Sequence, residues 1–128
     1  MDPITDFFIR IKNAYRAKKH VVVVPSSRMK EELARLLAER KYIAGWEKKG
    51  RKIRKFIELE LLYDGVTPAL SEVKRISKSS RRMYLGARDI RPVRQGFGLL
   101  IVSTSKGIMS GEDARKARLG GEAIAEIW

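Results

Sequence analysis

The chain opens with apolar residues that recur at helical spacing. Asp2 can accept a hydrogen bond from a free N–H at a helix start, and Pro3 has the fixed φ favoured at the first helical position. The apolar positions that follow share one face of such a helix: Ile4, Phe7, Phe8, Ile11, Ala14 and Tyr15. The opposite face carries Thr5, Asp6, Lys12, Asn13 and Arg16. We therefore predict an amphipathic helix whose polar face is available to a partner.

A second helix is predicted over about residues 28–40, capped by Ser26 or Ser27. Its expected buried stripe is Met29, Leu33, Leu36 and Leu37. Arg28 and Lys30 lie in the first turn, where cations oppose the helix dipole. This placement slightly favours an anionic ligand at the helix start, although a solvated face is the simpler explanation.

Strand signals surround this second helix. The β-branched run Val21–Val24 and the segments 42–46 and 53–63 are typical of strands. Lys48-Lys49-Gly50-Arg51 is expected to join the last two as a glycine hairpin with a strongly basic tip. Asp64-Gly65 then marks the predicted boundary between two halves.

The second half is predicted to consist mainly of strands. Ser110 and Asp113 resemble a capping box that starts a short helix, which Gly120-Gly121 would end. The other expected elements are strands over 70–76, 83–85 and 122–128, a basic turn over 77–82 and a helical turn over 89–92. The prediction is an α+β protein of two small lobes. They are an N-terminal α-β-α-β-β unit over 1–64 and a mainly β unit with one short helix over 65–128.

Charge narrows the class of partner. The 128 residues include 28 Lys and Arg against 15 Asp and Glu, for a net charge of +13, and both halves share the excess. Such charge gives affinity for a polyanion through counterion release. There is no cysteine, which excludes disulfides and thiolate zinc sites and fits a reducing cytosol. No apolar stretch approaches the roughly 18 residues typical of a membrane span, so we expect a cytoplasmic protein without a membrane partner.

The most informative segment is the run Gly98–Gly107, in which an apolar strand changes abruptly to Ser103-Thr104-Ser105-Lys106-Gly107. Hydroxyls both donate and accept hydrogen bonds, and a following glycine permits close approach of the backbone to a ligand. An ordinary Ser/Thr turn after a strand is the alternative that these residues alone leave open. In so basic a chain, the segment favours contact with a nucleic acid.

Catalysis is not expected. Ser103 or Ser105 as a nucleophile lacks a glycine-flanked elbow, and the sole histidine, His20, lies in the other half. Gln95–Ile101 partly echoes an RNA-recognition strand, but Leu99 and Ile101 stand where stacking aromatics belong. Because aromatic residues are only 8% of the chain, folded helical RNA is favoured over a single strand. No cofactor or metal site is predicted.

Several separate motifs resemble the bacterial ribosomal protein S8 family of the small subunit, from end to end. The motifs are Asp2-Pro3-Ile4 through Arg10–Ala14, Pro25–Lys30, Gly96-Phe97-Gly98 leading into Ile101–Gly107, and Ala114-Arg115 with Gly120-Gly121-Glu122. The resemblance implies a two-domain α/β protein that binds a helical element in the central domain of small-subunit ribosomal RNA. It also implies contacts with neighbouring ribosomal proteins and, in many bacteria, repression of the protein's own messenger RNA.

The resemblance also implies site residues. Ser103, Thr104, Ser105, Lys106 and Gly107 would enter the minor groove of the RNA helix, with Tyr84 and Glu122 nearby. The sugar-phosphate backbone would meet Thr5, Lys12, Arg28 and Lys30. Two positions depart from the family pattern. Ser79-Ser80 replaces a usual Pro-Gly beside the RNA surface, and Lys41 replaces a common glycine. A general basic nucleic-acid binder without a fixed target is the alternative function.

Overall fold

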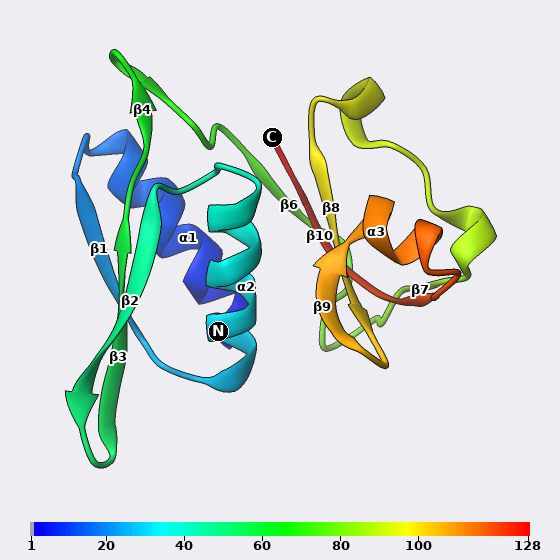
Figure 1. Cartoon of the computed structure of the whole chain (residues 1–128), viewed down its shortest axis with the longest axis horizontal. Coiled ribbons are helices and arrows are strands. Elements are labelled where there is room, and N and C mark those ends of the chain that lie inside the picture. The colour runs from blue at the N-terminus through cyan, green and yellow to red at the C-terminus, as the bar shows by residue number, and fades with distance from the viewer. Residues whose placement is uncertain (1) are drawn as a thin grey trace. The chain divides into compact units, whose positions relative to one another are not determined.

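The computed structural model in Figure 1 describes residues 2–128. It confirms the α+β class, with an α/β first unit and a mainly β second unit that has one short helix. Within the described part of the chain, no helix combines the length and apolar character needed to cross a membrane.

The boundary between the two compact units lies after Ser71, and the second unit spans Glu72–Trp128. The sequence placed this boundary after Asp64. The Asp64-Gly65 turn instead closes a small hairpin of β4 (Tyr63–Asp64) and β5 (Thr67–Pro68), which stays with the first unit.

Helix α1 (Pro3–Arg16) begins as predicted, because Asp2 Oδ1 accepts a hydrogen bond from the Ile4 N–H at 2.9 Å. Its predicted apolar face is buried at Phe7, Phe8, Ile11, Ala14 and Tyr15, with Ile4 partly buried. Full burial of large apolar side chains is the main favourable contribution that a surface helix makes to the fold.

Helix α2 (Arg28–Glu39) is capped by Ser27, whose Oγ accepts a hydrogen bond from the Lys30 N–H at 3.2 Å. The predicted stripe was wrong at its first position. Met29 is 37% exposed, whereas Lys30 is only 8% exposed. Lys30 continues the helical spacing of Leu33, Ala34 and Leu37, so its long aliphatic stem covers the position that a methionine was expected to fill.

The first unit has an antiparallel sheet in the order β1-β3-β2, formed by β1 (Val21–Pro25), β2 (Gly45–Arg51) and β3 (Arg54–Glu60). Helix α1 packs against β1 and α2 against β2. Strand β3 is central, and its Ile57 and Leu59 are fully buried. The helices and the central strand therefore build the core of this unit.

The predicted hairpin between β2 and β3 was misplaced. Lys48-Lys49-Gly50-Arg51 lies within β2, and the turn is Lys52-Ile53, since Arg51 pairs with Arg54. The segment 42–44 is not a strand, because the Tyr42 N–H donates to the Leu37 carbonyl and closes the end of α2. These backbone bonds delay the start of β2 to Gly45.

The second unit contains a five-stranded sheet. The path β6-β10-β8-β9 consists of β6 (Val73–Arg75), β10 (Gly121–Ile127), β8 (Leu99–Thr104) and β9 (Gly107–Ser110), and β7 (Tyr84–Leu85) also pairs with β10. Residues 99–102 of β8 are all buried, as predicted for a strand covered on both faces. One face packs a cluster that includes Leu100, Val102, Ala123 and Ala114.

Two turns in this unit differ from prediction. The expected helical turn at residues 89–92 is split into 3-10 turns at η1 (Ala87–Asp89) and η2 (Val93–Gly96), because a proline at 92 disfavours helical backbone at the residue before it. Helix α3 (Gly111–Lys116) is capped by Ser110, as predicted. It ends before the two glycines, since Arg118 itself takes the left-handed conformation at φ 58°.

Candidate nucleic-acid interface

The segment 103–107 is a tight β-hairpin turn between β8 and β9. Ser103 and Thr104 are half-buried strand residues, and only Ser105 and Lys106 form the exposed turn. Gly107 has φ 106°, a conformation that favours glycine and lets a two-residue turn close with the twist of the flanking strands. The predicted loop is therefore a short hairpin turn with a defined backbone conformation.

Thr104 holds this turn together. Its Oγ1 donates a hydrogen bond to the Gly107 carbonyl at 2.9 Å and accepts one from the Lys106 N–H at 3.1 Å. The Ser103 and Ser105 hydroxyls have no hydrogen-bond partner among residues 2–128. Two of the three hydroxyls are thus available to a ligand, and the third fixes the backbone that presents them.

Tyr84, Glu122 and Ser103 lie in one row across three strands. Glu122 of β10 pairs with Ser103 of β8 on one side and with Tyr84 of β7 on the other. Directly opposed residues of antiparallel strands project from the same face, so the sheet register brings together residues that are far apart in sequence. Tyr84 is 70% exposed, which leaves its ring free for a contact.

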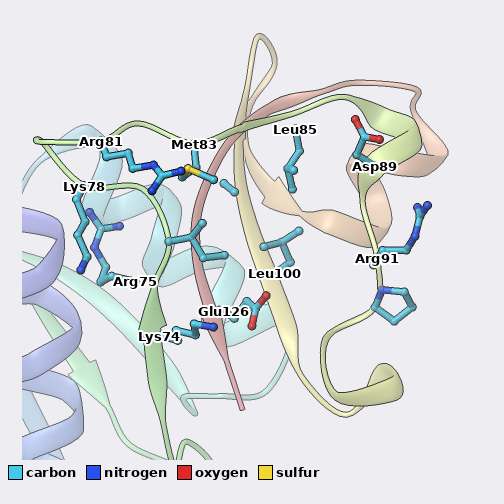
Figure 2. A pocket seen from close by; sticks show the side chains of 13 residues that line it. Lys74, Arg75, Lys78, Arg81, Met83, Leu85, Asp89, Arg91, Leu100 and Glu126 are labelled. Atoms are coloured by element: carbon cyan, nitrogen blue, oxygen red, sulfur yellow. The ribbon is translucent and has the colours of Figure 1, made fainter.

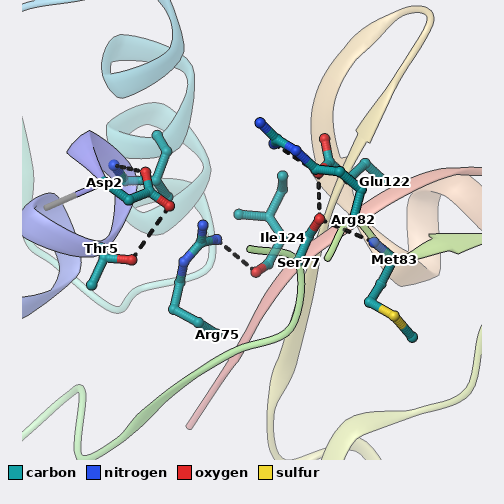
Figure 3. Close-up of polar contacts among 9 residues, drawn as sticks. Asp2, Thr5, Arg75, Ser77, Arg82, Met83, Glu122 and Ile124 are labelled. Carbon is teal, nitrogen blue, oxygen red and sulfur yellow. Dashed lines mark hydrogen bonds and ion pairs between the residues drawn. The ribbon is translucent and has the colours of Figure 1, made fainter. Parts of the chain in front are cut away.

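The Glu122 carboxylate is held by two side chains from the segment between β6 and β7. Ser77 Oγ donates a hydrogen bond to Glu122 Oε2, and Arg82 Nη1 donates to the same oxygen at 3.1 Å (Figure 3). The Ser77 Oγ also accepts a hydrogen bond from the Met83 N–H at 3.1 Å. The carboxylate therefore fixes the segment that leads into Tyr84.

These contacts decide the charge of Glu122. Burial raises the pKa of its carboxyl, but the hydrogen bonds from Ser77 and Arg82, together with the positive charges of Arg82 and Arg75, outweigh burial and lower the pKa below its ordinary value. Glu122 is consequently ionised at neutral pH, with its negative charge directed at an arginine.

Two glycines permit the close strand approach that this row requires. A Cβ on Gly121 would lie 2.2 Å from the Ser103 carbonyl oxygen, and a Cβ on Gly120 would lie 2.6 Å from the Leu85 carbonyl oxygen. Both contacts are with backbone, which cannot move aside as a flexible side chain can. Any larger residue at Gly121 would push β10 away from the turn-bearing strand β8.

The first unit carries the other four predicted site residues on its two helices. Thr5 and Lys12 are partly buried on α1, where the Thr5 hydroxyl lies 3.5 Å from Asp2 Oδ2. Arg28 is exposed at the start of α2. Lys30 is largely covered, but no buried side-chain nitrogen among the described residues lacks a partner, so its ammonium group reaches the surface.

The described part of the second unit also contains a cavity of about 580 Å³, shown in Figure 2. Its lining residues on β8 and β10 alternate with Ser103 and Glu122, which places the cavity on the opposite face of the sheet. Leu100 and Ala123 line it, and Lys74 and Arg91 are among the cations around it. Strand alternation separates this cavity from the hydroxyl row. Across residues 2–128, no group of three or more His, Cys, Asp or Glu side chains could hold a metal ion.

Sequence reasoning missed some of the exposed and positioning residues. Ser77 and Arg82 were assigned only to a basic turn, and their joint contact with Glu122 depends on pairing across about 40 residues. Phe97 is 86% exposed, although it stands beside a buried strand. The glycines on both sides of Phe97 are the signal that this segment is a turn and not part of the core.

The family description "Ribosomal protein S8" matches residues 2–128. The chain belongs to the ribosomal protein S8 family. Proteins of the S8 family are structural and not enzymes, in agreement with the expected absence of catalysis.

Curated relatives match this chain over nearly its whole length. Small ribosomal subunit protein uS8 of Dictyoglomus turgidum is 44% identical over 127 residues, which cover 99% of this chain and 97% of the relative. The protein of the same name from Mycoplasmopsis pulmonis is 44% identical, with coverage of 99% and 96%. That from Thermus thermophilus is 41% identical over 135 residues, with coverage of 99% and 98%.

Replacing Gly121 with alanine should destabilise the protein. The new Cβ must displace the Ser103 backbone, and we expect the free energy of unfolding to fall by about 1–3 kcal/mol. Urea unfolding measures the effect. Gly45→Ala in β2 is the control, because a Cβ there meets nothing within 4 Å and Gly45 has no positive φ. Equal stability of the two variants would contradict the close approach.

Replacing Glu122 with glutamine should have an effect that depends on pH. Because the folded-state pKa is lowered, the ionised carboxylate stabilises the fold at neutral pH, and this contribution is lost as the pH falls from the ordinary value of 4.5 through the lowered value. Wild type should exceed Glu122→Gln in unfolding free energy at pH 7, and this difference should shrink as the pH falls below 4.5. Glu126→Gln controls for the loss of one carboxylate. A difference between wild type and Glu122→Gln that stays constant as the pH falls from 7 to below 4.5 would rule out this linkage.

Proposed function

We propose that this protein is a structural component of the small ribosomal subunit in the cytoplasm. In this role it binds a helical element in the central domain of small-subunit ribosomal RNA. The match to the S8 family over residues 2–128 carries the proposal. The curated relatives named as small ribosomal subunit proteins support it, because they align with almost the entire chain. Neighbouring ribosomal proteins and a matching helix in its own messenger RNA are the further partners that we propose.

The β8–β9 turn is the part of the protein that we assign to the RNA minor groove. That groove is wide and shallow in helical RNA and displays 2′-hydroxyls. Small hydroxyls on a narrow turn fit such a surface, and Ser103 and Ser105 have hydroxyls free for this contact. Lys106 follows Ser105 in the exposed turn, and its ammonium group would meet a phosphate.

Tyr84 and Glu122 have different roles in the proposal. The exposed Tyr84 ring can stack on an unpaired base at an irregular point of the helix. Glu122 would act indirectly, because its carboxylate is already engaged by Ser77 and Arg82. It orders the segment before Tyr84 and is a positioning residue.

The first unit would contact the sugar-phosphate backbone. Arg28 and the surface end of Lys30 present cations at the start of α2, and Lys12 adds one from α1. Thr5 supplies a hydroxyl two turns before Lys12 on the same helix face. Such contacts add affinity that depends on salt and position the hydroxyl row without reading sequence.

Competition between RNAs tests the function. Filter binding at matched salt should show that the protein prefers the central-domain ribosomal RNA fragment over unrelated RNA and DNA duplexes by about 4 kcal/mol or more, which is typical of specific recognition. A transcript of its own messenger RNA should compete if the regulatory part is correct. Equal affinity for all duplexes would replace the proposal with a general basic nucleic-acid binder.

Two substitutions should separate hydroxyl contacts from phosphate contacts. Ser105→Ala should weaken binding to the ribosomal RNA fragment with little change in salt dependence, whereas Lys30→Met should lower the salt slope by about one phosphate contact. Methionine keeps the buried stem of Lys30 and removes only its charge. Ser71→Ala, an exposed serine outside the proposed interface, is the control. An unchanged slope for Lys30→Met would remove Lys30 from the interface.

A further inference from the structure

The β2–β3 hairpin extends beyond the third strand of its sheet. The register of β1 against β3 runs to Pro25 and Phe56, and one further backbone hydrogen bond joins the Ser26 N–H to the Lys55 carbonyl at 3.1 Å. Pairing of β2 with β3 continues beyond this point to Arg51 and Arg54. Residues 50–55, here called the hairpin tip, therefore end the hairpin, and residues 51–54 form a short two-stranded arm, which Figure 1 shows in green at the end of the first unit's sheet.

The hairpin tip carries four cations that the fold does not neutralise. They are Arg51, Lys52, Arg54 and Lys55, all exposed. Closer to the body of the unit, Lys48 Nζ lies 3.3 Å from Glu31 Oε1, and Lys49 Nζ lies 2.8 Å from Glu58 Oε2. Within residues 2–128, no carboxylate forms an ion pair with any of the four tip cations. In this hairpin, Lys48 and Lys49 thus form ion pairs with carboxylates, whereas the four cations of the hairpin tip form none with the described residues.

The arrangement of these cations is unfavourable for the isolated protein. Arg51 and Arg54 are direct cross-strand partners, and like charges in that position destabilise a hairpin. Lys52 adopts φ 55° in the turn, a conformation that non-glycine residues rarely take. A nearby polyanion would attract each of these cations and so offset the repulsion between them.

Ile53 stands at the end of the arm with 98% of its surface exposed. Its neighbours in the chain are Lys52 and Arg54, so an aliphatic side chain is flanked on both sides by cations. Ile53 adds nothing to the core of the unit. The combination is suited to a ligand that offers anionic groups around a less polar surface, such as the phosphates and riboses of a helical RNA groove.

We propose that the hairpin tip is a second RNA-binding element, in which the four cations contact phosphates on both sides of a minor groove and Ile53 packs against ribose. The proposal rests on the ribosomal RNA function above and adds a site on the first unit that is separate in sequence from residues 103–107. Four cations within five residues match the dense charge of an RNA helix.

Charge-matched variants of the full chain test the electrostatic part. In the tip variant, Arg51, Lys52, Arg54 and Lys55 are each replaced by Gln, and in the control, Lys18, Lys19, Arg35 and Lys41 are each replaced by Gln. All eight residues are exposed, and both variants lose four positive charges. Binding to the central-domain ribosomal RNA fragment is measured over a range of KCl concentrations. The tip variant should lose about tenfold or more in affinity, and its salt slope should fall by about one for each lost phosphate contact, well beyond the control.

Directed cleavage tests the position of Ile53. Because the chain has no cysteine, Ile53→Cys provides a single site for tethering an iron–EDTA group. Val66→Cys is the matched control, since Val66 is 82% exposed at the turn of another hairpin of the same unit that carries no cluster of cations. Hydroxyl radicals from position 53 should cleave the ribosomal RNA fragment at a compact site, and those from position 66 should not.

The outcomes separate the two proposals. If wild type prefers the ribosomal RNA but the tip variant behaves like the control, or positions 53 and 66 cleave alike, the hairpin-tip proposal is wrong and the ribosomal RNA function stands. If wild type shows no preference for ribosomal RNA, both fail. Retained RNA affinity in the tip variant with lost binding to anionic vesicles or an acidic peptide would assign the tip to another class of partner.

Discussion

The pairing of β10 between β7 and β8 is the constraint on which the proposed RNA surface depends. It places Glu122 between Ser103 and Tyr84, which are far apart along the chain and are brought together by this strand pairing. The pairing is possible because Gly121 lets two backbones approach more closely than any side chain would allow. The sheet therefore determines where the exposed turn lies, and the hydrogen bonds of the Thr104 hydroxyl fix the backbone conformation of the turn.

The acidic residues form ion pairs with some of the cations of this basic chain and leave others without a carboxylate partner in its described part. Several carboxylates hold a nearby cation: Asp6 with Arg10, Glu31 with Lys48, Glu58 with Lys49 and Glu122 with Arg82. Exposed pairs of this kind contribute little stability individually. Their effect is to determine which cations are left without a carboxylate partner among residues 2–128. Four such cations lie together at the hairpin tip.

Local signals predicted the local structure well. Asp2-Pro3 and the helical spacing of α1 predicted its start and its buried face, because capping and burial act on neighbouring residues. The phase of α2 was wrong because the sequence pattern treats lysine as polar, whereas the stem of Lys30 is buried. Gly50 suggested a turn at its own position. Gly50 has φ 99° but lies within β2, and Lys52-Ile53 form the turn.

For the candidate site, the sequence indicated the exposed turn but not the contacts that support it. Ser103-Thr104-Ser105 is visible as a change of polarity along the chain. The different role of Thr104 depends on hydroxyl geometry, and the Ser77 and Arg82 contacts with Glu122 depend on tertiary pairing. Neither has a signal in the local sequence, because each partner is compatible with many other structures.

The central claim is that one edge of the second unit's sheet, at the β8–β9 turn and Tyr84, faces the RNA. Amide chemical-shift mapping by NMR on the full chain, with the central-domain ribosomal RNA fragment as ligand, tests this most directly. The account predicts that the largest shifts in this unit occur at residues 103–107 and 84. Shifts confined to the opposite face, around Lys74 and Arg91, with residues 103–107 unaffected, would contradict it.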